Sequence, residues 1–268
     1  MLRARKKFGQ HFLADRNVIR RILDRAGLTS LDRVLEIGPG RGALTLPLAG
    51  RVASVLAVEK DRDLAAFLQE SLASRGVENV TLVTKDILTF DFTSLEPGFD
   101  GKWLAIGNLP YNISTPVLER LIEHRRLFRG AVLMFQKEVA DRLTAQAGSR
   151  TYGALSVLVR YHAEVSRLLR VGRECFRPSP RVDSTVVKLD FERPFPERAE
   201  DEVWFRNVVR AAFAHRRKTL QNALLTSFPD RTRTEVIQAL RDGEIDPGSR
   251  AETLGIEDFL RLSRVLPR

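Results

Sequence analysis

The chain has 268 residues, of which 43% are hydrophobic and 29% are charged. This balance excludes global disorder, and the length favours one large domain with a smaller one. No apolar run reaches the roughly 18 residues that a membrane span needs, and no secretory signal follows the basic start, so we expect a cytoplasmic protein. Because the chain has one cysteine, Cys175, and four scattered histidines, we expect neither an internal disulfide nor a metal site.

The formal net charge is +10, and the basic excess is unevenly spread. Residues 1–189 contain 30 lysines and arginines against 20 acidic residues, whereas residues 190–268 contain 14 of each. We expect nucleic acid as the partner rather than an anionic membrane, because no basic helix with a strong apolar face is evident. The basic segments, each equally compatible with a solvated face, are the N-terminal arm (Arg3, Arg5, Lys6, Lys7), residues 160–181 and residues 215–218.

Hydrophobic periodicity predicts helices that alternate with short apolar strands in the first part of the chain. The predicted helices cover residues 18–26, 43–49, 64–73, 117–122, 139–143 and 154–161. The predicted strands cover residues 33–37, 54–58, 80–83, 103–106 and 131–135. This order predicts an α/β domain with a parallel sheet covered on both faces. Two further strands, 164–171 and 185–191, are expected to form an antiparallel hairpin with a short loop at one sheet edge.

A domain boundary is predicted where residues 192–202 combine two prolines with seven charged side chains. Beyond it the apolar pattern is helical only, over residues 203–214, 217–228, 232–240 and 257–266. We therefore expect a first domain over residues 1–191 and a small all-helical domain over residues 192–268.

A glycine-rich turn follows the first predicted strand, in the segment EIGPGRG (36–42). Gly38, Gly40 and Gly42 permit a tight turn and the close approach of a ligand to the backbone. Glu59, about 20 residues further on, can accept hydrogen bonds from both ribose hydroxyls. Because the spacing is G-x-G-x-G rather than the G-x-G-x-x-G of dinucleotide sites, an adenosine cofactor without phosphate is favoured. The alternative is a plain strand-to-helix turn.

Asp86, in the segment KDIL after the third strand, is a second polar group for such a cofactor. Its carboxylate can accept the exocyclic amine of an adenine while Ile87 covers one face of the ring. The alternative interpretation is a side chain that caps a helix or turn.

The segment GNLPYNIS (107–114) lies at the carboxyl end of the fourth strand, where open α/β sheets bind ligands. Asn108 and the carbonyl of Leu109 can accept hydrogen bonds from the poorly nucleophilic N6 amine of an adenine. Pro110 stiffens the turn, and Tyr111 offers a flat face on which an unstacked base can rest. The alternative is an ordinary loop with a packed tyrosine.

A second aromatic side chain, Phe176, lies in the loop CFRPSPRVDS (175–184) among several arginines. Opposite Tyr111 it could sandwich a flipped base, and the alternative is a core phenylalanine. Cys175 beside it is interpreted as a packing residue, because no histidine lies near it in the sequence.

These motifs together resemble the ribosomal RNA adenine dimethyltransferases, in particular the bacterial small-subunit branch. The resemblance covers nearly the whole chain, through the segments KKFGQHFL, EIGPGRG, VEKD, KDIL, NLPYNIS, FQKEVADRL, FRPSPRVDS and RRKTLQNAL. It implies a Rossmann-like S-adenosylmethionine domain and a small helical domain. The expected methyl transfer requires no metal. The implied substrate is a pair of adjacent adenines near the 3′ end of 16S rRNA in the small ribosomal subunit or its precursor, methylated at N6 during ribosome assembly by a monomer.

The resemblance also implies roles for individual residues. The implied cofactor contacts are His11, Leu13, Gly38, Gly40, Glu59, Asp86 and Asn108. The implied groups around the target amine are Asn108, Leu109, Pro110 and Tyr111, with Phe176 as the second stacking face. His11 is a departure, since relatives often have asparagine there. Three alternatives stay open: a large-subunit rRNA methyltransferase of the antibiotic-resistance type, a DNA adenine methyltransferase, and a nucleic-acid-binding factor that retains the fold without catalysis.

Overall fold

The computed structural model describes residues 10–95 and 101–268. The predicted basic arm, Arg3 to Lys7, lies outside these residues. The described chain forms two compact units: one comprises the residues up to Ala140 together with Val165–Glu192, and the other comprises Asp141–Glu164 together with Arg193–Arg268. Residues 141–164, which the sequence placed in the first domain, thus pack with the helical unit.

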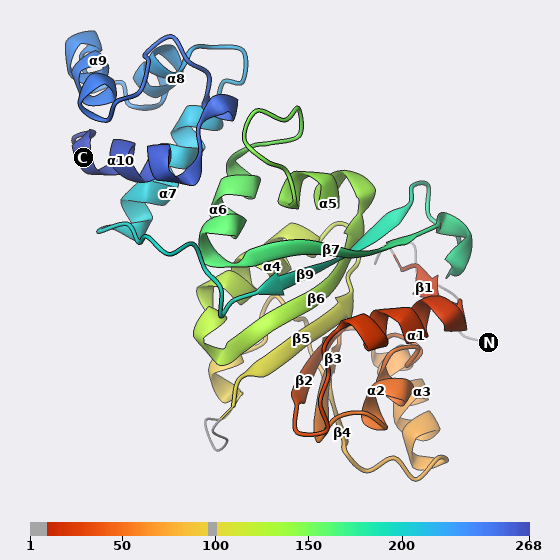
Figure 1. Ribbon diagram of the computed structural model, residues 1–268. Helices are drawn as coiled ribbons and strands as arrows, with labels where there is room; N and C mark the ends of the chain where they lie inside the picture. The colour runs from red at the N-terminus through yellow and green to blue at the C-terminus, as the bar shows by residue number, and fades with distance from the viewer. Residues whose placement is uncertain (1–9, 96–100) are drawn as a thin grey trace. The chain divides into compact units, whose positions relative to one another are not determined.

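A seven-stranded sheet forms the centre of the first unit (Figure 1). Its strands, in spatial order, are β4 (Val80–Thr84), β3 (Ser54–Glu59), β2 (Arg33–Ile37), β5 (Trp103–Asn108), β6 (Phe128–Gln136), β9 (Ser184–Asp190) and β7 (Glu164–Val171). Strands β4 to β6 pair in parallel, and β9 runs antiparallel to β6. The predicted mixed α/β sheet is therefore confirmed. The strand order reverses between β2 and β5, which is where such sheets form a ligand crevice.

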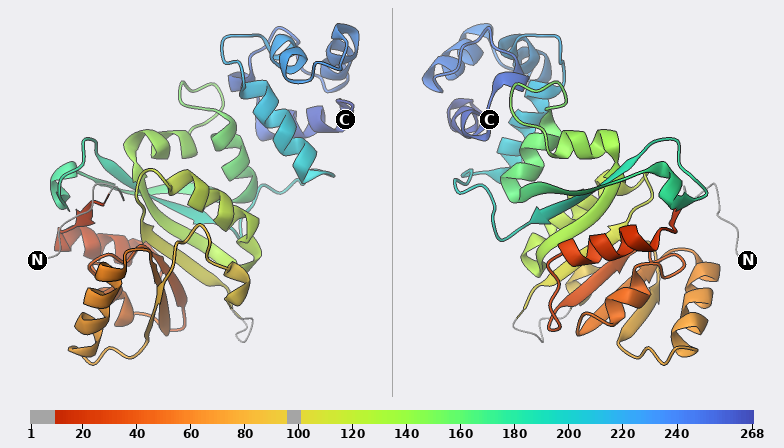
Figure 2. Two further views of the ribbon diagram at one scale, coloured as in Figure 1. Left: turned by 180° about the vertical axis from the view of Figure 1, so that it is seen from behind. Right: turned by 45° about the vertical axis from the view of Figure 1, so that its right-hand side comes forward.

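Helices cover both faces of this sheet, with α1 and α4 on opposite sides (Figures 1 and 2). The helices are α1 (Arg16–Arg25), α2 (Thr45–Ala49), α3 (Arg62–Ala73), α4 (Ser114–Glu123) and α5 (Lys137–Leu143), with 3₁₀ turns η2 (Phe92–Ser94) and η3 (Arg125–Leu127). Asp15 and Asp61 are the N-caps of α1 and α3: the Asp15 carboxylate accepts two backbone N–H groups of the first turn, and the Asp61 carboxylate accepts one. Buried side chains of α1, including Val18 and Ile22, pack against the sheet strands.

A short second sheet joins two segments that are far apart in the sequence. Strand β1 (Phe12–Leu13) pairs antiparallel with β8 (Phe176–Arg177), and the Ala14 N–H donates to the Cys175 carbonyl over 2.8 Å. The connection between β7 and β9 is therefore not the expected short loop, because it contains η4 (Arg173–Cys175) and β8. Sequence periodicity could not reveal two strands of two residues each that pair with one another across such a long stretch of chain.

The second unit is helical and has its own hydrophobic core. Its helices are α6 (Ala154–His162), α7 (Glu202–Phe213), α8 (Leu220–Ser227), α9 (Arg233–Asp242) and α10 (Ile256–Val265), with the 3₁₀ turn η5 (Ala251–Thr253). Phe205 of α7 and Phe259 of α10 are fully buried in that core. The four helices predicted after the boundary are present, although α8 begins at Leu220 rather than at residue 217.

Candidate S-adenosylmethionine site

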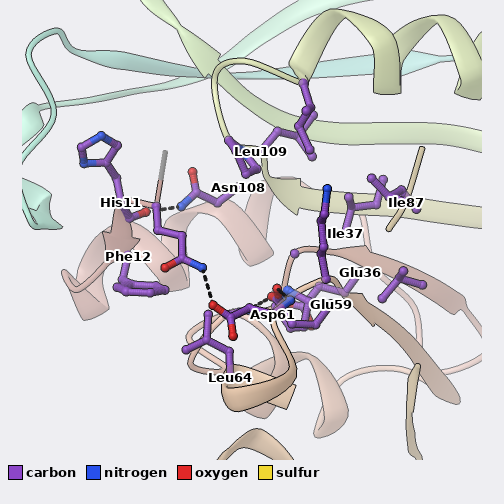
Figure 3. Close-up of a pocket in the computed structure, with 18 of the residues that line it drawn as sticks. His11, Phe12, Glu36, Ile37, Glu59, Asp61, Leu64, Ile87, Asn108 and Leu109 are labelled. Carbon is purple, nitrogen blue, oxygen red and sulfur yellow. Dashed lines mark hydrogen bonds between the residues drawn. The ribbon is translucent and has the colours of Figure 1, made fainter. Parts of the chain in front are cut away.

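A pocket lies at the carboxyl ends of β2, β3 and β5, wholly within the first unit (Figure 3). Its lining combines residues 10–13, 36–41, 43–44, 58–61, 64, 85–87 and 108–113. Parallel strands bring their carboxyl ends to one edge of the sheet, so segments separated along the chain converge there. The sequence-predicted residues His11, Leu13, Gly38, Gly40, Glu59, Asp86 and Asn108 to Tyr111 all line this pocket.

The glycine turn after β2 requires left-handed backbone geometry. Gly38, Gly40 and Gly42 have φ values of 67°, 57° and 78°, which L side chains rarely adopt. A Cβ atom on Gly42 would lie 2.6 Å from Leu68, whereas one on Gly38 would meet nothing within 4 Å. Gly42 is therefore needed for packing against α3, and Gly38 leaves backbone open to a ligand.

Glu59, the last residue of β3, anchors the turn. Its Oε2 accepts the Gly40 N–H over 3.0 Å, and its Oε1 accepts the Asp61 N–H over 2.8 Å. Burial raises the pKa of Glu59, and the two backbone N–H groups oppose this shift. Each carboxylate oxygen still has a lone pair for a ribose hydroxyl.

Glu36 is a pocket residue that the sequence interpretation missed. It is 1% exposed, and its Oε2 has no hydrogen-bond partner in the described part of the chain. Burial, reinforced by the nearby Glu59 carboxylate, raises the pKa of Glu36 to about 8. Its position in EIGPG, directly before the turn at a strand end, was the signal that could have identified it.

Asp86 caps the turn that follows it, as the alternative interpretation of this residue expected. Its side chain also lines the pocket. Its Oδ1 accepts the Leu88 N–H over 3.0 Å, and its Oδ2 accepts Lys60 Nζ over 2.7 Å. Partial burial raises the pKa of Asp86, but these two partners outweigh it and hold the pKa below its ordinary value. Asp86 is therefore an ionised acceptor, and the adjacent buried Ile87 supplies an apolar surface.

Asn108 has a defined orientation at the end of β5. Its Nδ2 donates to the His11 carbonyl over 2.9 Å, as the dashed line in Figure 3 shows. Because the amide nitrogen is directed at the backbone of residue 11, the carbonyl Oδ1 is left as the acceptor for a ligand amine. Asn108 thus presents a hydrogen-bond acceptor, which is the group that a target amine requires.

The rest of the NLPY turn leads directly into α4. The Ile113 N–H donates to the Pro110 carbonyl over 3.1 Å, and the Leu109 side chain is buried. The Tyr111 hydroxyl and Ser184 Oγ are 2.9 Å apart, within hydrogen-bond distance, and burial raises the Tyr111 pKa. Tyr111 is thereby held at the pocket as a neutral aromatic side chain.

Phe176 was predicted to be a site residue, but in the structure it does not line the pocket. Its side chain is 0% exposed, packs in the core and is the strand partner of Leu13. This position matches the alternative of a core phenylalanine, because a fully buried ring presents no face to a base. Leu13 is buried too, yet it does line the pocket.

Two contacts of residues 10–13 were also missed from the sequence. Gln10 Nε2 donates to Asp61 Oδ2 over 3.3 Å, and the Arg41 guanidinium lies 4.5 Å from the centre of the Phe12 ring. These contacts, with that between His11 and Asn108, place residues 10–13 in the lining of the pocket. Figure 3 shows His11 and Phe12 of this segment. Nothing local in the sequence indicates such long-range partners.

The residues present fit S-adenosylmethionine. Ile37, Leu64 and Ile87 supply apolar surface for an adenine, Glu59 supplies acceptors for a ribose, and Asp86 supplies an acceptor for an exocyclic amine. The carboxylates of the pocket favour a cationic ligand over one that carries phosphate. Within residues 10–95 and 101–268, no set of three or more histidine, cysteine, aspartate or glutamate side chains is placed to hold a metal ion. The same part of the chain has no helix long and apolar enough to cross a membrane.

Comparisons with known proteins agree with this geometry. Residues 1–267 match the family described as ribosomal RNA adenine dimethylase. Proteins named ribosomal RNA small subunit methyltransferase A are 46% identical in Desulforapulum autotrophicum (99% of this chain, 93% of the relative) and 45% identical in Bacillus thuringiensis (98% and 91%).

Two solved structures share the fold over nearly the whole chain, each at 29% identity. A dimethyladenosine transferase from Plasmodium falciparum has a TM-score of 0.78 and covers 94% of this chain and 96% of its own. The 23S rRNA methyltransferase ErmE has a TM-score of 0.73, with 96% and 100% covered. The pocket fits an adenosine cofactor without phosphate, and it lies beside the NLPY turn, in which Asn108 has a defined orientation. Because the family model also matches residues 1–267, this chain belongs to the ribosomal RNA adenine dimethylase family.

Proposed function

We propose that this protein is an S-adenosylmethionine-dependent methyltransferase that dimethylates adenine N6 in 16S rRNA. The observation that carries the proposal is the orientation of Asn108, whose Oδ1 is left as an acceptor by the hydrogen bond from its Nδ2 to the His11 carbonyl. Family membership and relatives named for the small subunit support the substrate class.

The cofactor, when bound, supplies a methyl carbon attached to a positively charged sulfur. Glu59 and the glycine turn hold its ribose, while Asp86 and Ile87 hold its adenine. Asn108 Oδ1 and the Leu109 carbonyl accept the hydrogens of the target N6 amine, which directs the nitrogen lone pair toward the methyl carbon. Tyr111 supports the target base by stacking. Most of the catalysis is then positioning, which contributes roughly 7 to 11 kcal/mol at most.

The finer features of the substrate belong to the same proposal. We place the target at two adjacent adenines near the 3′ end of 16S rRNA, within the small subunit or its precursor, with a role in ribosome assembly. The enzyme acts as a cytoplasmic monomer. The basic excess of residues 1–189 supports contact with an RNA backbone.

A large-subunit rRNA methyltransferase is the second candidate, because the structure of ErmE matches over 96% of this chain. The identity to ErmE is 29%, whereas the small-subunit relatives are 45–46% identical. We therefore favour the small subunit.

The test is transfer of labelled methyl from S-adenosylmethionine to small subunits that lack the modification, to large-subunit rRNA and to duplex DNA. Nuclease digestion identifies the modified base. We expect dimethyladenosine in the small subunit only. Label in the large-subunit RNA would support the second candidate, and cofactor binding without transfer to any substrate would favour a noncatalytic binding factor.

Asn108→Ala is the variant that tests the site. Loss of one positioned acceptor is expected to lower transfer by about 100-fold or more, as for other preorganised groups at a reacting centre. Asn17→Ala, an exposed position of α1, is the control and should keep the wild-type rate. Wild-type turnover by Asn108→Ala, with normal RNA binding, would refute the assignment.

A further inference from the structure

The KDIL turn, residues 85–90, carries the adenine side of the pocket but belongs to no helix or strand. Asp86 and Ile87 of this turn line the pocket. Two bonds within the turn give it its shape: the Leu88 N–H donates to Asp86 Oδ1 and the Thr89 N–H donates to the Asp86 carbonyl, each over 3.0 Å. Because such local bonds do not fix where a turn lies, its position depends on contacts with other elements.

Arg120 holds the end of the KDIL turn from helix α4. Its Nη1 donates to the Ile87 carbonyl over 2.5 Å, and its Nη2 donates to the Phe90 carbonyl over 2.8 Å. The start of the turn is attached separately, by the Lys85 N–H to the Glu59 carbonyl of β3 over 2.9 Å. Since a guanidinium is a rigid planar fork, one side chain that bridges two carbonyls fixes the orientation of the turn as well as its distance from α4.

An aromatic cluster fixes the guanidinium of Arg120. Its Cζ lies 4.7 Å from the centre of the Phe92 ring, which is fully buried. That ring packs edge to face with Phe90, His124 and Phe128, with centroids 5.2 to 5.7 Å apart. A cation over an aromatic face is attracted to it, so this contact orients the fork. Arg120 is half-buried and does not line the pocket, so it acts on a ligand only through the turn.

The positive charge of Arg120 favours the form of Asp86 that can accept an amine. Burial raises the pKa of Asp86, the bonds from Lys60 and the Leu88 N–H lower it, and the Arg120 charge lowers it further. An ionised carboxylate only accepts hydrogen bonds, which matches the two hydrogens of an exocyclic amine.

We propose that Arg120 is a positioning residue for cofactor recognition, which fixes the KDIL turn so that Asp86 accepts the exocyclic amine of the cofactor's adenine. This inference rests on the proposed function, in its assignment of the adenine to Asp86 and Ile87. The effect of Arg120 is therefore on cofactor affinity and on selectivity for the amine. The rate of methyl transfer from bound cofactor depends instead on the NLPY turn.

Two ligands separate recognition of the amine from binding of the rest of the molecule. One is S-adenosylhomocysteine, and the other is its analogue with an unsubstituted purine base, which lacks only the exocyclic amine. Calorimetry measures the affinity of each, and their ratio is the preference for the amine. The wild-type protein should show a preference of about 10-fold or more, the usual effect of a hydrogen bond to a charged group.

Arg120→Met keeps an unbranched side chain and removes the donors and the charge. Affinity for S-adenosylhomocysteine should fall about 10-fold and affinity for the purine analogue by less than about threefold, so the preference falls at least about threefold. In methyl transfer to unmethylated small subunits, KM for S-adenosylmethionine should rise about 10-fold while kcat stays within about twofold. Arg126→Met, which removes an exposed arginine of η3, is the control and should keep wild-type values.

Arg120→Lys is a second variant that keeps the charge and the alkyl chain. A single ammonium group cannot reproduce a planar fork that bridges two carbonyls, so the preference should still fall about twofold or more. Melting temperatures identify the variants that fold. If Arg120→Met does not fold, Arg120→Lys decides the question.

Two results would overturn the inference and leave the proposed function intact. One is a wild-type preference and a wild-type KM in the folded variant of Arg120. The other is an equal loss of affinity for both ligands, which would assign Arg120 to the stability of the whole pocket rather than to recognition of the amine.

The same measurements show separately whether the proposed function fails. A wild-type protein that binds both ligands but methylates no RNA would overturn the proposed function, while the ratio of affinities would still test Arg120. A wild-type protein without a preference for the amine would overturn the role of Asp86, and this inference with it.

Discussion

Asn108 and Glu59 show how a backbone hydrogen bond gives a side chain its chemical role. Asn108 presents an acceptor because its nitrogen donates to the His11 carbonyl, and Glu59 is oriented by the N–H groups of Gly40 and Asp61. Each is the last residue of its β-strand, and the two strands end at the same edge of the sheet. The sequence indicated their identity, whereas their orientation depends on partners that only the folded chain provides.

Glu36 gives a stability prediction with a definite sign. Its pKa is about 8 in the folded protein and 4.5 in the unfolded chain, so folding favours the protonated form. The stability from Glu36 is therefore fully present below pH 4.5 and is lost as the pH rises toward 8, by at most about 1.4 kcal/mol per pH unit.

Glu36→Gln should reduce this pH dependence because it cannot ionise. The measurement is the free energy of unfolding in urea at several pH values between 5 and 9, for wild type and variant. The variant should gain stability relative to wild type as the pH rises. Parallel curves for the two proteins would contradict the buried, protonated state of Glu36.

At the scale of elements, helix α1 forms where local sequence features favour it, and contacts with residues distant in the chain hold it in place. Asp15 Oδ1 accepts the Asn17 and Val18 N–H groups over 2.8 and 3.1 Å, and buried Val18 and Ile22 face the core. Next to it, β1 has no local reason to be a strand and exists because β8 pairs with it. The helix could be predicted from sequence, and the two-residue strand could not.

Asp15→Ala should lower the free energy of unfolding by about 1 kcal/mol, the usual effect of losing a helix N-cap. Asp24→Ala in the same helix is the control, because Asp24 is exposed and its ion pair with Arg51 is a surface pair of about 0 to 1 kcal/mol. Urea denaturation followed by circular dichroism measures both. Equal effects of the two variants would argue against the cap.

At the scale of the whole molecule, the basic excess belongs to the part of the chain that forms the pocket. Exposed arginines of the first unit include several on α1, on β7 and on the connection that follows it: Arg16, Arg20, Arg21, Arg25, Arg167, Arg170, Arg173, Arg177 and Arg181. The helical unit, by contrast, lies mostly in residues 190–268, which carry equal numbers of basic and acidic side chains. We expect the first unit to make most of the phosphate contacts.

This charge distribution predicts strongly salt-dependent binding of RNA. Each contacted phosphate contributes about 0.7 to 0.9 to the slope of log affinity against log salt, so affinity should fall at least tenfold between about 50 and 200 mM salt. Cofactor affinity, measured under the same conditions, should change far less. RNA affinity that stays constant with salt would exclude the basic surface as the binding face.

The sequence by itself determined the order of strands and helices, the glycine turn, the NLPY segment and the identity of most pocket residues. These depend on local causes: apolar periodicity, φ angles open to glycine and residues at strand ends. Only the tertiary structure decided that residues 141–164 pack with the helical unit, that Phe176 is buried, and that His11 stacks on Tyr111. Those features depend on contacts between residues far apart in the chain, such as Phe12 of β1 with Arg177 of β8, 165 positions apart, and on burial, which no short stretch of sequence specifies.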